Sequence, residues 1–465
     1  MFSTKTLTKF IVSLALFMDV LDSNILNTAV PVMSNYFHVS PIDLKIALIS
    51  YLLSLAIFIP TSGWTADHYG AKPVFISAFG LFTISSFFCG LSHTLNELVI
   101  ARIMQGIGGA FMVSLGRLMM VRAFKKHEFV QAMNTVIMVV SLGVMTGPFI
   151  GGVIVDHLSW QWIFWVNIPT GLFAILLASY HLKETTPKNK RPFDFFGFIL
   201  FGGSLATMVF SLAELSESTI NQHITILRFT VSVTMFLAYI FYSKGKKYPL
   251  IQLNLLRFRT FRISVTGNLC ARLGFGGVPF LLPLMQQIAF GFSAQLSGLL
   301  LLPIALGIIF AKNMSFRILK KLGYKKYLLM NTFFVGFILW TFYFVTTHTP
   351  LFVIAILTFL FGVFISAQYT GMNSLALAEI PPEALSASTS ITSTVQILAQ
   401  SFGVAIGAIL LRLYGSRINN LFHLTQTDFH RAFFTLGIIT FMSAIVFLQL
   451  RKGDGEQMLV SVTQH

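Results

Sequence analysis

Residues 141–152 read SLGVMTGPFIGG, within an apolar run over 129–155. The stretch contains four glycines and a proline: Gly143, Gly147, Gly151, Gly152 and Pro148. Three of the glycines recur at every fourth position, so a helix places them on one face with the fourth beside it. In lipid such a face lets a neighbouring helix approach closely, and neighbouring helices satisfy the backbone groups that a proline frees. The stretch therefore predicts a membrane-spanning helix packed tightly against another helix.

The composition extends this prediction to the whole chain. Of 465 residues, 55% are hydrophobic and 10% are charged, and the mean hydropathy is +0.78. Apolar runs of about 20 residues, the length that spans a bilayer, recur from end to end, whereas a membrane β-barrel would show alternating segments of about 10 residues. We therefore predict an all-α membrane protein with fourteen transmembrane helices. They are expected at 10–31, 44–66, 73–92, 97–120, 129–156, 162–182, 194–214, 222–243, 262–288, 296–316, 327–347, 350–377, 387–411 and 431–450.

The charge follows the membrane topology. The chain has 32 Lys and Arg against 16 Asp and Glu, a net charge of +16, which raises the question of nucleic-acid binding. Most of the basic residues, however, fall in alternate loops and at the termini, which is the pattern of the positive-inside rule. This pattern explains the charge without a nucleic acid and predicts that both termini are cytoplasmic.

The spans divide into six, two and six. We expect an N-terminal six-helix half over 10–182, basic linkers with two additional helices over 183–261, a C-terminal six-helix half over 262–450, and a short cytoplasmic tail over 451–465. A basic turn centred on glycine follows the second span of each half, as DHYGAK at 67–72 and KLGYKK at 321–326. Such an echo is typical of the internal repeats of transporters.

The first of these turns belongs to a longer motif, GWTADHYGAK at 63–72. Its candidate latch residues are Gly63, Asp67, Gly70 and Lys72. Asp67, at a helix end, can pair with a basic residue and accept hydrogen bonds from the N-terminus of a neighbouring helix, and Gly70 permits a tight turn. The alternative is a polar turn in which Lys72 only sets the topology.

The fourth span carries Arg102, with Gln105 one turn later. A buried arginine in a membrane is expensive, about 2.5–3.5 kcal/mol on insertion scales, so we expect it to have a partner or water. An arginine near the end of a span could instead extend to the membrane surface. Arg102 lies well inside the segment, which favours a functional role.

The first span carries Asp22 and, one turn earlier, Asp19. An acid at mid-membrane depth is normally neutral unless it is paired or hydrated, so its protonation can respond to access and to ligand. Asp22 is therefore the candidate proton carrier. Two close carboxylates disfavour double ionisation, which makes Asp19 a second candidate, or equally a hydrated residue at the mouth of a cavity. Asn24 and Asn27 could line the cavity or bond across helices.

Several stretches together resemble the signatures of the fourteen-helix drug:proton antiporter family in the major facilitator superfamily. They are LDSNILNTAVP at 21–31, the latch motif at 63–72, LVIARIMQGIGGA at 98–110, GVMTGPFIGG at 143–152 and WQWIFWVNIPTG at 160–171. The latch departs from the family pattern at His68 and Ala71, where basic residues are usual. The resemblance covers nearly the whole chain and comes nearest to the MdtD-type multidrug-resistance exporters. It implies the major facilitator fold, two six-helix halves around a central cavity, here with two extra central helices.

The function that this resemblance implies is proton-coupled secondary active export of small molecules across a bacterial cytoplasmic (inner) membrane. The glycines of the opening stretch resemble the antiporter motif of exporters. The cargo is expected to be of the multidrug-efflux type, or an organic anion or metabolite. Proton-coupled uptake on the same fold is the alternative, because the fold does not fix the direction of transport. A membrane sensor that does not transport would call for an added signalling domain, and neither the short tail nor the loops suggest one.

Three cations within the spans bear on the cargo. Arg272 is expected near mid-depth of its span, and Arg117 and Lys312 toward the cytoplasmic ends of theirs. A lipophilic cation would need acids or aromatic rings in the cavity. We hypothesise instead an anionic or carboxylate-bearing cargo held bidentately by Arg272, with Arg117 and Lys312 as a cytoplasmic-side funnel. Each cation could alternatively follow the positive-inside rule or neutralise the acids of the first span.

No Walker motif, metal-ligand cluster or nucleophile–base arrangement is visible in the sequence. We therefore expect neither an enzyme nor a metal or other cofactor, with the proton as the coupling ion. The expected partners are a small-molecule substrate and the lipid bilayer, with no nucleic acid. The oligomeric state stays open, with a monomer as the working expectation.

Overall fold

The computed structural model describes residues 4–124, 126–182, 192–215, 222–418, 421–456 and 458. This part of the chain contains 14 helical segments that are long and apolar enough to cross a membrane. They are Lys5–Phe37, Lys45–Tyr69, Ala71–Leu91, Leu95–Ala123, Gln131–His157, Trp162–His181, Phe195–Glu214, His223–Lys244, Arg259–Ala289, Ala294–Lys312, Met314–Phe344, Leu351–Leu377, Leu385–Tyr414 and Gln426–Leu448. The all-α class and the fourteen spans are confirmed. Many of the helices run past the predicted bounds, because helical hydrogen bonding continues into polar residues that hydropathy excludes.

The chain forms two compact units. Unit 1 comprises Met1–Phe195 with Ser293–Leu299, and unit 2 comprises Phe196–Phe292 with Leu300–His465. The predicted division into two six-helix halves, a two-helix insert and a tail stays a prediction. The predicted linker at 183–191 lies outside the described residues.

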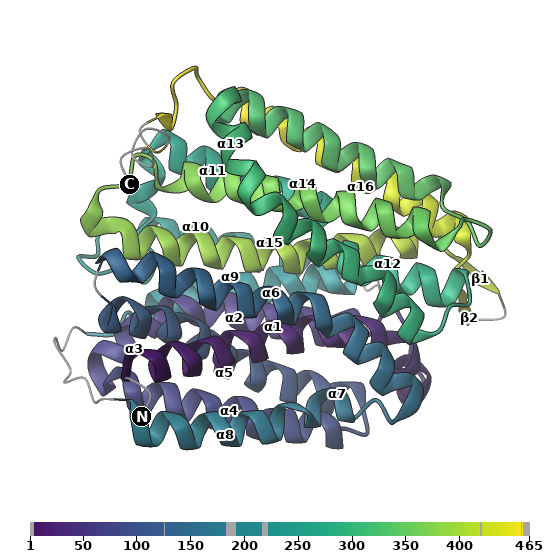
Figure 1. Ribbon diagram of the computed structural model, residues 1–465, viewed down its shortest axis with the longest axis horizontal. Helices are drawn as coiled ribbons and strands as arrows, with labels where there is room; N and C mark the ends of the chain where they lie inside the picture. The colour runs from purple at the N-terminus through teal and green to yellow at the C-terminus, as the bar shows by residue number, and fades with distance from the viewer. Residues whose placement is uncertain are drawn as a thin grey trace. The chain divides into compact units, whose positions relative to one another are not determined.

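The described residues of unit 1 up to Leu182 form eight α-helices and one 3-10 turn. They are α1 (Thr4–Phe37), α2 (Lys45–Phe58), η1 (Ile59–Thr61), α3 (Ser62–Tyr69), α4 (Ala71–Leu91), α5 (Leu95–Ala123), α6 (Lys126–His157), α7 (Trp162–Trp165) and α8 (Asn167–His181). Figure 1 shows α1, α4, α5 and α8 running side by side.

Glycines allow α5 to pack closely on two neighbours at once. A Cβ added at Gly106 would lie 2.6 Å from the carbonyl oxygen of Tyr51 on α2. One added at Gly108 would lie 2.9 Å from the carbonyl oxygen of Ala78 on α4. Only a hydrogen atom fits at either position, so α5 contacts α2 on one side and α4 on the other.

Unit 2 contains the remaining helices and the only strands in the described part of the chain. The helical segments are α9 (Phe195–Glu214), α10 (Gln222–Lys244), η2 (Leu253–Arg257), α11 (Arg259–Phe275), α12 (Val278–Leu284), η3 (Met285–Ala289), α13 (Ala294–Thr341), η4 (Phe342–Phe344), α14 (Leu351–Leu377), η5 (Pro382–Ala384), α15 (Leu385–Tyr414) and α16 (Gln426–Leu448). Residue Phe195 of α9 and the first turns of α13 belong to unit 1. Helix α11 packs against α14, α15 and α16.

A short hairpin joins α15 to α16, and the sequence patterns do not predict it. Strands β1 (Ser416–Ile418) and β2 (Leu421–His423) pair antiparallel (Figure 1). Strands of this length are too short to show a periodicity in the sequence.

The two basic turns share a backbone conformation. Gly70 has φ 90° and ψ 143°, and Gly323, the one non-helical residue within α13, has φ 70° and ψ 160°. Both lie in a region that residues with a side chain rarely adopt. The segments 67–72 and 321–326 therefore resemble each other in backbone conformation as well as in sequence.

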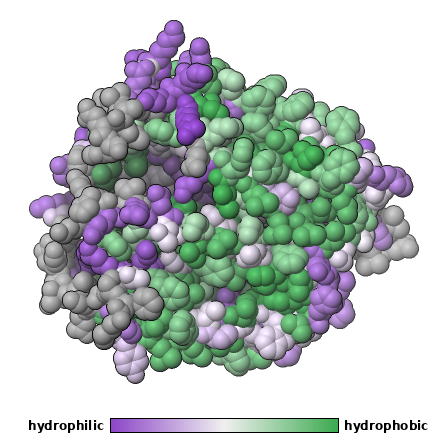
Figure 2. Space-filling model, in the orientation of Figure 1, coloured by the Kyte–Doolittle hydropathy of each residue, from purple (hydrophilic) through white to green (hydrophobic). Residues whose placement is uncertain are grey.

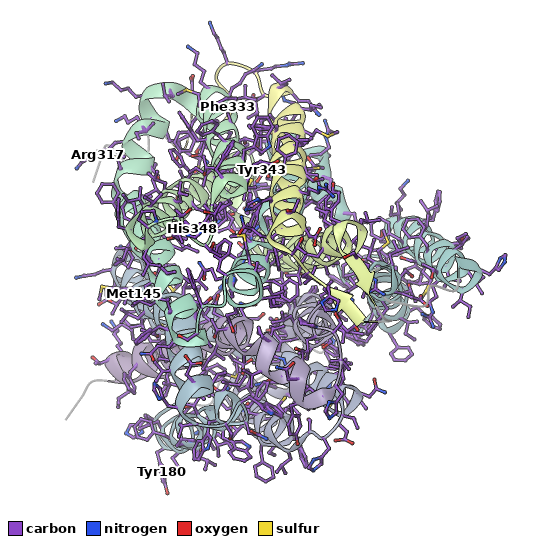
Figure 3. All side chains as sticks on the ribbon, turned by 90° about the vertical axis from the view of Figure 1, so that its right-hand side faces the viewer. Met145, Tyr180, Arg317, Phe333, Tyr343 and His348 are labelled. Atoms are coloured by element: carbon purple, nitrogen blue, oxygen red, sulfur yellow. The ribbon has the colours of Figure 1, made fainter. Side chains whose placement is uncertain are left out.

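The surface is apolar where a membrane-spanning chain requires it. Hydrophobic residues cover the middle of the face in Figure 2, and hydrophilic residues gather toward its left and right margins. Large side chains such as Ile84 and Ile226 are more than half exposed. Tyr180, on α8, is 82% exposed and projects away from the helices in Figure 3. A surface of this kind is stable in contact with the hydrocarbon tails of a lipid bilayer.

Candidate functional site

The interior of unit 1 holds a fully buried arginine. Arg102 lies two turns into α5, whose first turn is capped by the Thr94 side chain accepting the N–H of Glu97 at 3.3 Å. Its Nη1 donates to Oδ2 of Asp22 on α1 at 2.5 Å. Its Nε donates to the Ala47 carbonyl of α2 at 3.4 Å. The expectation that Arg102 has a partner is confirmed.

The Asp22 carboxylate is held by side chains from two further directions. Its Oδ1 accepts a hydrogen bond from Gln105 Nε2 on α5 and another from Asn167 Nδ2 on α8, both at 2.8 Å. All of these side chains are buried. Hydrogen bonds to an ionised group are stronger than neutral ones, so this carboxylate ties α1 to α5 and α8.

Gln105 extends the network to α4. Its Oε1 accepts from Arg102 Nη1 at 2.6 Å, and its Nε2 also donates to Ser86 Oγ at 2.8 Å. The Cys89 thiol donates to the same Oε1 at 3.6 Å. One amide therefore connects the ion pair to two side chains of α4.

Tyr51, on α2, connects the second acid to the same cluster. Its hydroxyl donates to Asp19 Oδ1 at 2.5 Å. Its ring lies beside the guanidinium of Arg102, with 4.2 Å between Cζ and the ring centroid. The ring centroid of Phe164 lies 5.7 Å from the same Cζ. Both acids of α1 therefore contact the group around Arg102, Asp22 through an ion pair and Asp19 through Tyr51.

This arrangement places the buried guanidinium of Arg102 against the carboxyl group of Asp22, and Tyr51 connects it to the carboxyl group of Asp19. Removing one partner of a buried ion pair typically costs about 3–5 kcal/mol, because the other charge is left uncompensated. A proton added to Asp22 would remove its negative charge without removing the side chain. The cluster can therefore respond to protonation by changing the strength of the contact between α1 and α5.

The two asparagines of α1 bond locally. Nδ2 of the half-buried Asn24 donates to the Val20 carbonyl at 2.7 Å, and Nδ2 of the buried Asn27 donates to the Asn24 carbonyl at 3.3 Å. These amides thus hydrogen-bond to their own helix, whereas Gln105 bonds across helices. Their predicted place in a substrate cavity stays a prediction.

The glycine face of α6 contacts α1, as its spacing predicts. A Cβ added at Gly143 would lie 3.2 Å from the Phe17 side chain, one at Gly147 3.0 Å from Asn24 Cβ, and one at Gly151 2.5 Å from the Ile25 carbonyl oxygen. The carbonyl of Pro148 accepts a hydrogen bond from the Thr28 hydroxyl of α1 at 3.2 Å.

The fourth glycine contacts a different segment. A Cβ at Gly152 would lie 2.3 Å from the carbonyl oxygen of Ala294, in the first turn of α13 that belongs to unit 1. The Asp156 carboxylate accepts the N–H of Gln295 at 2.7 Å and that of Ala294 at 3.3 Å, which caps this turn. The prediction of one glycine face with a fourth glycine beside it is confirmed; its role in antiport stays a prediction.

The latch residues lie at the ends of α3 and α4. Asp67 forms an ion pair with Arg122 at the end of α5, at 3.6 Å, and Lys72 Nζ donates to the Ser179 carbonyl of α8 at 2.9 Å. Gly70 makes the turn between them, and nothing lies within 4 Å of a Cβ built at Gly63. The motif thus connects the ends of four helices of unit 1, α3, α4, α5 and α8.

The three cations linked to the cargo are divided between the units. Arg117 lies on α5 in unit 1 and is exposed, whereas Arg272 and Lys312 lie in unit 2. Lys312 is exposed and Arg272 is buried. The funnel that would use all three stays a prediction.

The sequence patterns assign no site role to Tyr51, Ser86 or Asn167. A tyrosine or serine in an apolar run looks like an ordinary core residue, so neither carries a signal. Asn167 carries one, because a polar amide in an apolar segment normally requires a hydrogen-bond partner. That signal does not identify Asp22, 145 residues away in sequence, as the partner.

The sequence of this chain is similar to that of known membrane proteins. Residues 12–403 and 317–458 match the family model described as Major Facilitator Superfamily. The "Putative multidrug resistance protein MdtD" of Escherichia coli (strain K12) is 33% identical over 456 residues, covering 97% of this chain and 96% of that protein. The protein of the same name from Shigella boydii serotype 18 (strain CDC 3083-94 / BS512) matches to the same extent.

Solved structures share the fold at lower sequence identity. The crystal structure of a D-xylose-proton symporter has a TM-score of 0.69 at 15% identity, covering 97% of this chain and 99% of that one. The nucleoside transporter NupG has a TM-score of 0.67 at 13% identity, covering 96% and 99%. At these identities the likeness concerns the fold alone.

Proposed function

Because this chain belongs to the major facilitator superfamily and is a multi-pass membrane transporter, we propose that it is a proton-coupled exporter of small molecules. The observation that carries the proposal is the buried pair of Asp22 and Arg102. A transporter that uses a proton gradient needs a protonatable group whose charge alters contacts between helices, and Asp22 is such a group. The name of the relatives, a multidrug resistance protein, supports export as the direction.

Asp22 acts as the proton carrier in this proposal. Ionised, it is bound to Arg102, Gln105 and Asn167. Protonated, it keeps the amide contacts and loses the attraction to the guanidinium, so the two forms favour different arrangements of α1 and α5. A ligand that prefers one arrangement is then linked to the proton through the same equilibrium.

Asp19 is the second acid in the proposal. It contacts Tyr51, whose ring lies beside Arg102, so a change in the ion pair reaches Asp19 through one side chain. No cofactor is required, because the proton is the coupling ion. An even number of crossings returns the chain to the side where it starts, and the basic loops favour the cytoplasm of a bacterial inner membrane for both ends.

Proton-coupled uptake is the second candidate function. One observation favours it: a D-xylose-proton symporter shares the fold over nearly the whole chain. The fold does not decide the direction. Export is preferred because the relatives at 33% identity carry a multidrug resistance name, whereas the symporter is only 15% identical.

The direction can be tested in everted membrane vesicles with an acidic interior. An antiporter accumulates its cargo inside such vesicles while protons leave. We would follow ethidium as a lipophilic cation, benzoate and succinate as organic anions, and the internal pH. We expect accumulation of a cargo, a partial loss of the pH gradient on its addition, and loss of both effects with a protonophore. Proton-driven loss of cargo from preloaded vesicles would contradict export and favour uptake.

A further inference from the structure

Unit 2 contains a buried arginine in an environment without acids. Arg272, on α11, is 7% exposed. The sequence contains no Asp or Glu between residues 218 and 378. The other described acids of unit 2 either have partners near helix ends or, as with Glu383 and Glu456, are exposed. Among the described residues, the side chain of Arg272 has neither a hydrogen bond nor an ion pair, and its Nε is buried without an acceptor.

The position of Arg272 within its span argues against a simple topological role. It lies about 20 Å along the helix from Arg259, at a rise of about 1.5 Å per residue. A bilayer core is about 30 Å thick, so Arg272 lies well inside it if Arg259 is near the surface. An arginine that serves the positive-inside rule is found in a loop or near a helix end at the interface. One that extends to the interface would have an exposed head group, and this one is buried.

The ring of Tyr369 lies against the guanidinium of Arg272. On α14, this ring lies with its centroid 4.1 Å from Cζ of Arg272. Contact with a ring face stabilises a cation by up to about 2 kcal/mol when water is absent. A guanidinium that stacks on a ring keeps the N–H groups at its edge available for hydrogen bonds. Those donors match the two oxygens of a carboxylate.

Neighbouring contacts hold both residues in place. Tyr369 also contacts the ring of Phe275, at 5.8 Å between centroids. The preceding residue, Gln368, accepts from Asn331 Nδ2 at 2.7 Å and donates to Thr332 Oγ1 at 3.0 Å, which fixes α14 against α13. Residues that are already held lose little conformational entropy when a ligand binds.

A second orphan group lies one turn away on α11. Asn268 is 1% exposed, its Nδ2 donates to the Ser264 carbonyl at 3.2 Å, and its Oδ1 has no partner among the described residues. Positions i and i+4 share a face of a helix, so Asn268 and Arg272 lie on the same side of α11. Their orphan groups are an acceptor and a set of donors, the combination that a carboxylate with a nearby hydroxyl or N–H would satisfy.

Arg102 and Arg272, the two buried arginines among the described residues, differ in the partners that they have. Arg102 in unit 1 is bonded to Asp22 and Gln105, with an aromatic ring beside it. Arg272 in unit 2 has the ring without the acid. The helix C-terminus near Arg272 offsets part of the charge, because its carbonyl groups carry partial negative charge. A buried N–H group still requires an acceptor, and Nε of Arg272 has none among the described residues.

We propose that Arg272 is a binding residue for a carboxylate and that the cargo includes small organic anions. The guanidinium holds the carboxylate in two parallel hydrogen bonds, Tyr369 fixes its plane, and Asn268 accepts from a donor group on the anion. That the anion is cargo rests on the proposed export function; that it binds does not.

Binding can be measured on the purified full chain in nanodiscs, without transport. The probes are lactate, which has a hydroxyl beside its carboxylate, benzoate, which has none, chloride and the lipophilic cation tetraphenylphosphonium. The readouts are calorimetry and thermal unfolding. We expect saturable binding of at least one carboxylate, weakened at least tenfold in Arg272→Gln. Arg272→Lys keeps the charge and loses the fork of donors, so binding should weaken while unfolding stays near that of the wild type.

The matched control is Arg228→Gln. Arg228 lies in the same unit, on α10, and its exposed side chain pairs with Glu214, so the control should bind carboxylates normally. If Arg272→Gln does not fold, the lysine variant and Tyr369→Leu provide the test, and both should bind more weakly. Binding that is equal for chloride and carboxylates, or unchanged in the Arg272 variants, would overturn the proposal.

The two proposals fail in different ways. Carboxylate binding that depends on Arg272, without proton-driven transport in vesicles, leaves the binding site standing and rejects the exporter. Proton-driven export of ethidium, with no carboxylate binding to the wild type, leaves the exporter standing and rejects the anion site.

Discussion

At the scale of single residues, the interior of unit 1 pairs a buried charge with several donors and acceptors. Arg102 is 0% exposed and bonds to Asp22, Gln105 and the Ala47 carbonyl. The free-energy cost of desolvating a guanidinium is offset only if the ion pair has good geometry and further hydrogen bonds satisfy the remaining N–H groups. The same network brings Tyr51 between Arg102 and Asp19, so the tyrosine has two separable roles, one for its hydroxyl and one for its ring.

Substitution of Tyr51 separates these roles. Tyr51→Phe removes the donor to Asp19 and keeps the ring beside Arg102, and an unsatisfied buried group costs about 1–3 kcal/mol. We expect a lower unfolding temperature for Tyr51→Phe and a still lower one for Tyr51→Leu, which also loses the ring. Thermal unfolding of the purified protein measures both.

Tyr180→Phe is the matched control, because this tyrosine is 82% exposed and projects outward (Figure 3). It should unfold like the wild type. If Tyr51→Phe also unfolds like the wild type, the hydroxyl contributes nothing to stability and Asp19 has another partner.

How much of the site the sequence predicts depends on the residue type. Asp22, Arg102 and Gln105 are polar groups in apolar runs, so each attracts notice, and the structure brings the three together. Tyr51 and Ser86 carry no such signal. The partner of Asn167 cannot be predicted either, because it comes from a helix far away in the sequence.

At the scale of helices, close packing on glycine defines the contact of α1 with α6. The spacing of Gly143, Gly147 and Gly151 predicts a smooth face, and α1 packs against that face. Which helix packs there is not predictable from the spacing, because any neighbouring helix could use a small-residue face. The short hairpin between α15 and α16 likewise has no periodicity to reveal it.

Gly151→Ala tests this face. Its new Cβ would lie 2.5 Å from the Ile25 carbonyl oxygen and 2.6 Å from Thr28 Oγ1, so α1 must move away. We expect a lower unfolding temperature and transport reduced at least tenfold in energised vesicles. The amount of protein in the membrane should fall less than the transport rate. Gly151→Leu should be worse.

Gly80→Ala is the control, because nothing lies within 4 Å of a Cβ at that position of α4. Alanine favours a helix over glycine by about 1 kcal/mol, so this variant should be as stable as the wild type or more so. Equal stability and activity of Gly151→Ala and Gly80→Ala would show that α1 and α6 do not need close approach.

At the scale of the whole molecule, hydropathy and charge predict the number of spans, and the structure confirms fourteen. The predicted division of the chain into two six-helix halves and a two-helix insert stays a prediction. Compact unit 1 takes in Ser293–Leu299, which the sequence places in the C-terminal half. Sequence periodicity reports which face of a helix is apolar and does not report which distant segment covers that face.

Reporter fusions test the predicted orientation. Fusions after Lys190, Lys247 and Lys452 should report the cytoplasm, because the basic loops remain there. A fusion in the loop at 216–222 should report the outside. A cytoplasmic signal from that loop would contradict the fourteen-span topology.

The most direct test of the account is proton flux through reconstituted protein carrying Asp22→Asn. An amide has the shape of the carboxylic acid and cannot release a proton. In proteoliposomes containing a pH-sensitive dye, cargo-driven proton flux should fall at least tenfold, while exchange of labelled for unlabelled cargo continues. Asp43→Asn, the same change in the turn before α2, should leave the flux unchanged. Undiminished cargo-driven proton flux in Asp22→Asn would contradict the account, because the proton would then be carried elsewhere.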